Sequence, residues 1–244
     1  MSEPVTTTQA PDRSAARPET WIMGVAAFVA TVAIGMLLVY PRGAPQSQQP
    51  AESQSLSSPA PTPQAGERIN IPSLGLGIVR PASWVTITAD QNARNLRSVR
   101  MDDPEFQALA TRYANSPIVA MAKHPEPYAD LNPSLKINVR PLGGFAGHPP
   151  EEILAAALPM FQHAFADMRV LEGPKRTSLV GRPAGFVRMA YTLRAGTIAV
   201  PAVSEIWVVP KGPVYFMVGS GTRADERNGS RAEVRAIIDT LKLD

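Results

Sequence analysis

The sequence predicts an α+β fold, an antiparallel β-sheet flanked by helices, preceded by a single transmembrane helix. Residues 186–194 alternate between apolar and polar side chains, which is typical of a half-buried antiparallel strand. The segments after Pro149 and Ser230 carry apolar residues at helical spacing. Residues 21–40 contain no charge, and at ~1.5 Å per residue they cover roughly the 30 Å hydrocarbon core of a bilayer.

The apolar run WIMGVAAFVATVAIGMLLVY is predicted to be an uncleaved membrane anchor. A signal peptide has a shorter apolar region of roughly 7–15 residues, followed by small residues at its cleavage site. Arg13 and Arg17 lie before the run, whereas Arg42 is the only Lys or Arg between the run and Arg68. The positive-inside rule therefore places the polar tail 1–20, expected to be disordered, in the cytoplasm. The C-terminal domain is predicted to lie outside a bacterial inner membrane.

Residues 41–67 are predicted to be a linker, with six prolines, five glutamines and five serines. Such a composition cannot bury enough apolar surface to fold, and its prolines favour extended polyproline II. Fully extended, the segment would reach about 80 Å at ~3.1 Å per residue. It is either a tether that spans part of the envelope or a spacer that keeps the domain clear of lipid.

Residues 68–244 are predicted to form one exported domain. Its first strands are expected at Ile78–Val79 and at 84–88, joined by a turn at 81–83, with a short third strand at 98–101. Asp102 and Asp103 before Pro104 indicate the start of a helix that runs to about residue 114. Strands at 118–122 and 136–140 are expected to pair across a long loop.

The second half is predicted to be strand-rich between two helices. A helix is expected to begin at 149–152, where two glutamates suit the positive end of its dipole. In the strand 186–194, one face carries Arg188, Thr192 and Arg194, and strands at 203–209 and 214–218 follow. Ser230 and Glu233 form a capping-box pattern before a helix whose apolar face continues to Leu241.

Several of these patterns resemble the PsbP/DcrB-like family of α/β/α sandwich domains, over about Gly75 to Leu243. The matching features are Ala82-Ser83-Trp84 in the early strands, the helix after Pro149-Pro150, the hairpin series from Leu179 to Tyr191, and the strand 214–218 before the final helix. The family includes photosystem accessory proteins and bacterial envelope proteins. The resemblance implies a binding or accessory fold, and it carries over no catalytic residue.

The composition excludes several classes of site. The chain has no cysteine, which rules out thiolate zinc sites, iron–sulfur clusters, disulfides and cysteine nucleophiles. The net charge is +3 and the basic residues are scattered, so no nucleic-acid-binding surface is expected. No cofactor is expected, since Gly75-Leu76-Gly77 and Gly143-Gly144 lack the other residues of a phosphate-binding loop.

The weak candidates for a metal site are His124, Glu126 and Asp130, which lie close together in a Pro-rich segment. Such residues can supply a nitrogen and carboxylate oxygens, and related photosystem proteins hold metals. The spacing is not diagnostic, and an exposed loop histidine beside acids is usually solvated. His148 and His163, the remaining histidines, are expected in a helix-entry loop and on a helix surface.

No catalytic set is found, and the chain is predicted not to be an enzyme. Gly219-Ser220-Gly221 is no nucleophile elbow, because no histidine follows Ser220. The row Arg188, Thr192 and Arg194 either meets an acidic partner or lipid headgroups, or is simply a solvated face. The leading hypothesis is a membrane-tethered envelope protein whose domain supports a protein or envelope partner. The alternatives are a small-ligand or metal-binding envelope protein and, third, an envelope hydrolase.

Overall fold

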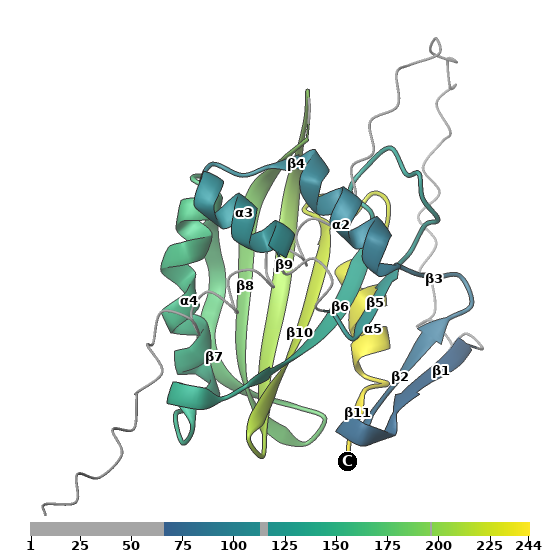
Figure 1. Cartoon of the computed structure of the whole chain (residues 1–244). Coiled ribbons are helices and arrows are strands. Elements are labelled where there is room, and N and C mark those ends of the chain that lie inside the picture. The colour runs from purple at the N-terminus through teal and green to yellow at the C-terminus, as the bar shows by residue number, and fades with distance from the viewer. Residues whose placement is uncertain (1–65, 113–116, 196) are drawn as a thin grey trace, which may run out of the picture.

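The computed structural model describes residues 66–112, 117–195 and 197–244. Most strands form one eight-stranded antiparallel sheet in the order β3-β5-β6-β10-β9-β8-β4, in which β7 also pairs with β8 (Figure 1). The strands of this sheet are β3 (Val85–Thr86), β4 (Val99–Arg100), β5 (Val119–Ala122), β6 (Ser134–Pro141), β7 (Arg169–Leu179), β8 (Arg182–Ala195), β9 (Ile198–Lys211) and β10 (Val214–Arg223). A three-stranded sheet joins β1 (Gly66–Ile71), β2 (Leu76–Pro81) and β11 (Lys242–Leu243).

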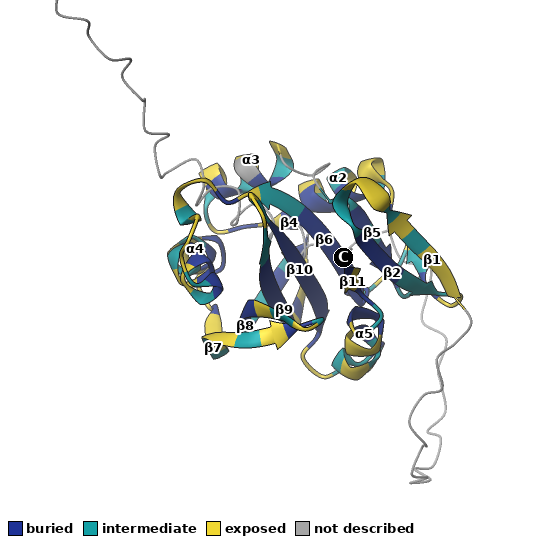
Figure 2. Cartoon of the chain, turned by 90° about the horizontal axis from the view of Figure 1, so that it is seen from below, coloured by how far each residue is buried: buried dark blue, intermediate teal, exposed yellow. Residues whose placement is uncertain are grey.

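The large sheet has a hydrophobic core on each of its two faces. Its helices are α2 (Ala89–Ser98), α3 (Pro104–Arg112), α4 (Pro150–Ala164) and α5 (Arg231–Ile238), with short 3-10 helices η1 (Pro72–Leu74) and η2 (Gly143–Phe145). Buried residues of α2, α3 and α4 share the first core with β8. The second core joins α5 and the small sheet to the opposite face. Figure 2 shows the buried strands between these two covering layers. The predicted α+β class, an antiparallel sheet flanked by helices, is therefore confirmed for the described residues.

The alternation of β8 has the predicted consequence. Val187, Met189, Tyr191 and Leu193 all lie in the first core. Phe186, which precedes them with the opposite side-chain direction, packs in the second core against Trp207. The period of two in the sequence is thus the period of a strand between two layers.

Two helix starts follow the predicted capping chemistry. The Ser230 hydroxyl accepts from Glu233 N at 3.1 Å, and the Glu233 carboxylate accepts from Ser230 N at 2.9 Å. The Asp103 carboxylate accepts from Glu105 N and Phe106 N at the start of α3. The last helix ends at Ile238, earlier than predicted, and the chain then enters β11, which pairs with β2.

The predicted pairing of the first strands is wrong. Ile78 pairs with Ile69 of β1, whereas Val85 of β3 pairs with Ala122 of β5 in the large sheet. The turn at 81–83 therefore carries the chain from one sheet to the other and does not close a hairpin. The strand expected at 84–88 is cut short because Thr88 caps α2, where its hydroxyl accepts from Gln91 N.

The predicted tail 1–20, transmembrane helix 21–40 and nearly all of the linker 41–67 lie outside the described residues, although β1 begins at Gly66. Within 66–112, 117–195 and 197–244, no helix has the length and apolar character needed to cross a bilayer.

Candidate functional site

The loop between β5 and β6, residues 123–133, contains all three metal candidates, but the structure directs them to different partners. The His124 Nε2 atom lies 3.0 Å from the Asn228 carbonyl, and its ring stacks on Tyr128 with centroids 4.3 Å apart. Glu126 turns inward to α2, and Asp130 turns toward β10. Across the described parts of the chain, no three His, Asp or Glu side chains form a group that could hold a metal ion.

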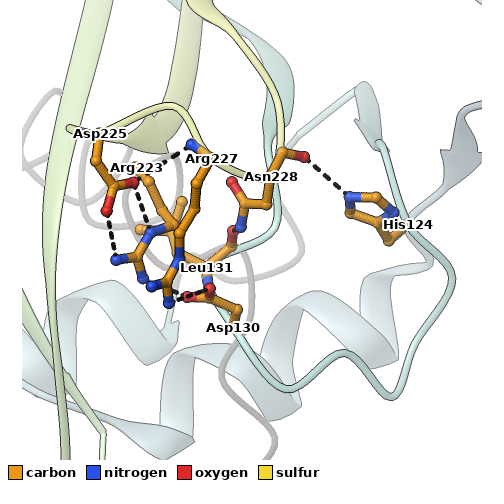
Figure 3. A network of polar contacts seen from close by, with 7 residues as sticks. All are labelled: His124, Asp130, Leu131, Arg223, Asp225, Arg227 and Asn228. Atoms are coloured by element: carbon orange, nitrogen blue, oxygen red, sulfur yellow. Dashed lines mark hydrogen bonds and ion pairs between the residues drawn. The ribbon is translucent and has the colours of Figure 1, made fainter. Parts of the chain in front are cut away.

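The outward side of this loop is tied to the segment after β10 by a set of contacts that we call the loop brace: Asp130, Arg223, Asp225, Arg227 and Asn228 (Figure 3). Arg223 Nη1 donates to Asp130 at 2.6 Å, and its Nε and Nη2 atoms each donate to Asp225 at 2.8 Å. Arg227 reaches the second Asp130 oxygen at 3.0 Å, and Asn228 donates to the Leu131 carbonyl at 2.5 Å. The brace therefore fixes two loops that are distant in sequence.

The charges of the loop brace reinforce one another. Partial burial acts to raise the pKa of Asp130, but the hydrogen bonds from Arg227, Leu131 N and Arg223 outweigh it, so the pKa is lowered. The hydrogen bonds from Arg223 bring the pKa of Asp225 down to about 2. Both carboxylates thus remain ionised and paired at neutral pH, which suits a structural clasp and not a general acid or base.

The inward side of the same loop meets a buried polar group that we call the lysine cluster: Lys136, Asn92, Asn95 and Glu126. Lys136 on β6 is fully buried, and its Nζ atom donates to Asn92 Oδ1 of α2 at 2.5 Å. Asn95, also of α2, donates to Glu126 Oε1 at 2.7 Å. Two acceptors of the cluster, Asn95 Oδ1 and Glu126 Oε2, are buried without a hydrogen-bond partner.

Burial makes Lys136 unusual among the described basic residues. Desolvation of the ammonium lowers its pKa to about 7, although the nearby charge of Glu126 acts in the opposite direction. An amine with such a pKa can serve as a base or nucleophile at neutral pH. Here, however, α2 covers the amine and the side chain has no exposed surface. The lysine cluster therefore attaches α2 to the sheet, and a substrate cannot reach the buried amine.

The sequence pattern did not reveal this cluster. Lys136 and Asn138 alternate with Ile137 and Val139, which is typical of a strand with one solvated face. The structure instead buries both polar residues completely. The one available signal was the pair Asn92 and Asn95, three residues apart and therefore on one face of a helix.

The row Arg188, Thr192 and Arg194 is occupied by acidic groups of the same chain. Arg188 contacts Glu172 at 2.7 Å and Glu205 at 2.6 Å. Arg194 lies 4.0 Å from both Asp102 and Asp167, and Asp167 also accepts from Thr192 N. These contacts favour the solvated-face interpretation over a docking row for an acidic partner.

The remaining sequence candidates are dispersed. His148 pairs with Glu152 at 2.8 Å beside the start of α4. Ser220 is buried within β10, in register with Glu205 and Leu135, and not at a strand-to-helix turn. His163 is exposed and lines a surface pocket of about 440 Å³ between α3 and α4, together with Phe106, Arg112 and Met160.

Comparison with known proteins gives only structural likenesses, since no protein-family model and no curated protein matches the chain. One similar structure, from Bacteroides thetaiotaomicron, has a TM-score of 0.40 and 12% identity, covering 73% of this chain and 48% of that one. The chain thus spans about half the length of that protein.

Two further structures are similar over most of their own length. LpqN, involved in cell envelope biogenesis of Mycobacterium tuberculosis, has a TM-score of 0.40 and 12% identity, covering 72% of this chain and 85% of LpqN. Cyanobacterial PsbP (CyanoP) from Synechocystis has a TM-score of 0.37 and 10% identity, covering 73% and 92%. A PsbP protein is thus among the structures to which this chain is similar. At these TM-scores no partner or activity is transferred, and function is inferred from this chain's own residues.

Proposed function

We propose that this chain is a membrane-tethered envelope protein whose PsbP-like domain binds and supports a protein partner without catalysing a reaction. The observation that carries the proposal is that the main polar side chains pair with one another within the domain. The residues of the loop brace pair with one another, Arg188 contacts two glutamates, and Lys136, the described amine whose pKa lies near neutrality, is covered by α2. Such cross-bracing keeps loops in a fixed shape, which favours recognition of a partner over chemistry.

The surface offers one place where a partner could contact apolar side chains. Val170 and Leu171 of β7 are the exposed large hydrophobic residues of the described chain, with exposures of 38% and 53%. Among the described residues, their strand pairs with β8 alone, so its other edge has no strand partner there. Exposed apolar residues on an unpaired edge are suited to contact another protein.

The experiment is site-directed photo-crosslinking in native membranes. A photoreactive residue replaces Leu171 in the full-length chain, and the matched control replaces Lys242, an exposed residue of the small sheet. The proposal expects one defined adduct from position 171 and none of that mass from position 242. Sustained turnover of an envelope substrate by the purified protein, or adducts of equal yield from both positions, would overturn the proposal.

A second function, small-ligand binding, is favoured by the pocket between α3 and α4. Its volume of about 440 Å³ falls in the range of ligand sites. Phe106 and Met160 give it an apolar part, and its polar lining combines Arg112 and His163 with the carboxylates of Asp103 and Glu105. Metal binding at His124 and Glu126 has no such geometric support. A titration with Zn²⁺ or Mn²⁺ that leaves the melting temperature unchanged would remove the metal version.

A further inference from the structure

The small sheet has one apolar face and one polar face. Its inward side chains, which contribute to the second core, are Ile69, Ile71, Leu76, Ile78 and Leu243. Because side chains alternate along a strand, Arg68, Asn70 and Lys242 point the other way, and all three residues are exposed. Figure 2 shows β1 largely exposed at the rim of the domain. The outward face of the small sheet is therefore open to a ligand from outside.

The polar side chains of this outward face converge on a glycine. Gly77 of β2 stands in register with Asn70 of β1 on one side and with Lys242 of β11 on the other. A Cβ atom at Gly77 would lie 3.0 Å from Asn70 Oδ1 and 3.2 Å from Arg68 Nη1. The missing side chain leaves a depression of about 270 Å³. We call it the sheet pocket, and its lining includes Arg68, Asn70, Gly77, Lys242 and Asp244.

The two basic residues that line the sheet pocket are not neutralised by the domain. Arg80 on β2 pairs with Glu67, the acidic residue of β1, at 2.6 Å. In the described parts of the chain, by contrast, no ion pair involves Arg68 or Lys242. Both cations are thus available to an anion from outside the domain.

A third cation lies beside the sheet pocket. The Lys211 ammonium donates to the Leu74 carbonyl at 3.0 Å, and it would lie 2.6 Å from a Cβ atom at Gly75, another lining residue. Asp244 is the acidic side chain among the described lining residues. Three basic side chains against one acidic side chain leave an excess of positive charge at the pocket.

The size and chemistry of the sheet pocket suit a phosphate group. Its volume of about 270 Å³ lies just below the range of about 300–1,000 Å³ that is typical of sites for larger small molecules. The planar guanidinium of Arg68 can donate to two phosphate oxygens at once, and the Lys242 ammonium adds a compact charge. The Asn70 amide supplies two further N–H donors.

The position of the sheet pocket favours a membrane lipid as the source of that phosphate. Strand β1 begins at Gly66, and the predicted linker ends at residue 67, so the tether leads directly into the small sheet. A flexible tether keeps the pocket at a high effective concentration relative to the lipid headgroups. Attraction of one basic residue to an anionic membrane surface favours the bound state about fivefold.

We propose that the sheet pocket binds the phosphate of an anionic phospholipid headgroup and docks the domain on the membrane that anchors it. This inference rests on the membrane tether of the function proposed above, and it adds how the domain is oriented. Figures 1 and 2 both show β7 and β1 on opposite sides of the domain. A domain docked through the small sheet therefore leaves the exposed Val170 and Leu171 free for the protein partner.

The test uses the full-length chain embedded in lipid nanodiscs. Because the chain has no cysteine, Ser73→Cys places a single fluorophore on η1, next to Pro72 of the pocket lining. The discs contain phosphatidylcholine, with or without phosphatidylglycerol, and a nitroxide on some headgroups quenches a docked label. Phosphatidylglycerol should increase the quenching, and high salt should reverse the increase. A label at Ala166→Cys, exposed on the loop between α4 and β7, is the control and should show no increase.

Variants separate the pocket from general electrostatic attraction. Arg68→Gln should lower the ratio of docked to undocked protein about fivefold. Arg94→Gln, which removes an exposed charge of α2, is the matched control and should leave the ratio unchanged. Asp244→Asn should raise the ratio, because it removes the acidic side chain from the lining. Gly77→Val keeps every charge but fills the pocket, so it should weaken docking at least as much as Arg68→Gln.

Each failure has a distinct reading. Equal quenching in the two kinds of embedded disc overturns the docking site and leaves the tether intact, whereas a chain that does not embed contradicts the tether and this inference with it. Docking that survives Gly77→Val, or Gly77→Ala if the valine variant does not fold, assigns the attraction to net charge and overturns the pocket. An emission shift of the Ser73→Cys label with inorganic phosphate, without any effect of phosphatidylglycerol, assigns the pocket to a soluble phosphate and overturns the lipid.

Discussion

The guanidinium of Arg223 lies 2.6 Å from the carboxylate of Asp130, a residue 93 positions earlier in the chain. Arg223 is almost completely buried, and its Nε and Nη2 atoms donate to Asp225. The contact closes the loop brace and sets the position of the loop that contains His124 and Glu126. Three predictions from the structure and one from the sequence can be measured directly.

Arg223→Met should destabilise the domain by about 2–3 kcal/mol, because it leaves Asp130 partly buried without its closest cation. The free energy of unfolding in urea measures this change. Arg227→Met is the matched control, since the Arg227 side chain is 63% exposed and contacts the same carboxylate. The control should cost less than about 1 kcal/mol. An equal loss in the free energy of unfolding for the two variants would show that burial of Arg223 adds nothing to its contribution to stability.

The loop brace should make stability depend on acid. Asp130 and Asp225 have pKa values below the ordinary 3.8 in the folded protein, with that of Asp225 at about 2. Carboxylates of this kind contribute stability above their unfolded pKa, and that contribution is lost as the pH falls through the folded value. The melting temperature should therefore drop between about pH 4 and about pH 2. Arg223→Met should show a shallower drop over this interval, and an identical drop would assign the effect to other acids.

Gly185→Ala should lift the start of α4 from the sheet. A Cβ atom at Gly185 would lie 2.5 Å from the Pro150 carbonyl oxygen, too close for backbone that cannot move aside freely. Overpacking of this kind costs about 1–3 kcal/mol, measured as the free energy of unfolding. Gly144→Ala is the control, because a Cβ there meets nothing within 4 Å. A change within about 0.5 kcal/mol is expected for the control.

The full-length chain should fractionate with membranes, and removal of residues 21–40 should release it. The reason is the uncharged run of that segment, which is long enough to span a bilayer. A periplasm-active reporter fused after Asp244 should be active, since the positive-inside rule places the C-terminal domain outside. Activity of only a cytoplasmic reporter would show the reverse topology.

Much of the architecture could be predicted from the sequence, because it depends on local patterns. The alternation of residues 186–194 predicted β8, the capping box at Ser230 predicted α5, and the acids after Pro149 predicted the start of α4. By contrast, β7 was not predicted, because most of its residues are exposed on both faces and show no period of two. Helix α2 was missed because its buried face consists largely of asparagines.

The sequence by itself determined the absence of thiol chemistry and the antiparallel sheet with helices, and it raised the expectation of a tail, a membrane anchor and a linker before the domain. Only the tertiary structure decided where the polar residues go. His124, Glu126 and Asp130 are neighbours in sequence, yet they contact Asn228, Asn95 and Arg223 respectively. From its strand pattern, Lys136 is expected to be solvated. In the structure α2 covers it, and its partner Asn92 lies forty-four positions earlier in the chain. The reason is physical: strand and helix periods follow from local backbone geometry, whereas burial of a charge depends on which distant segment packs against it.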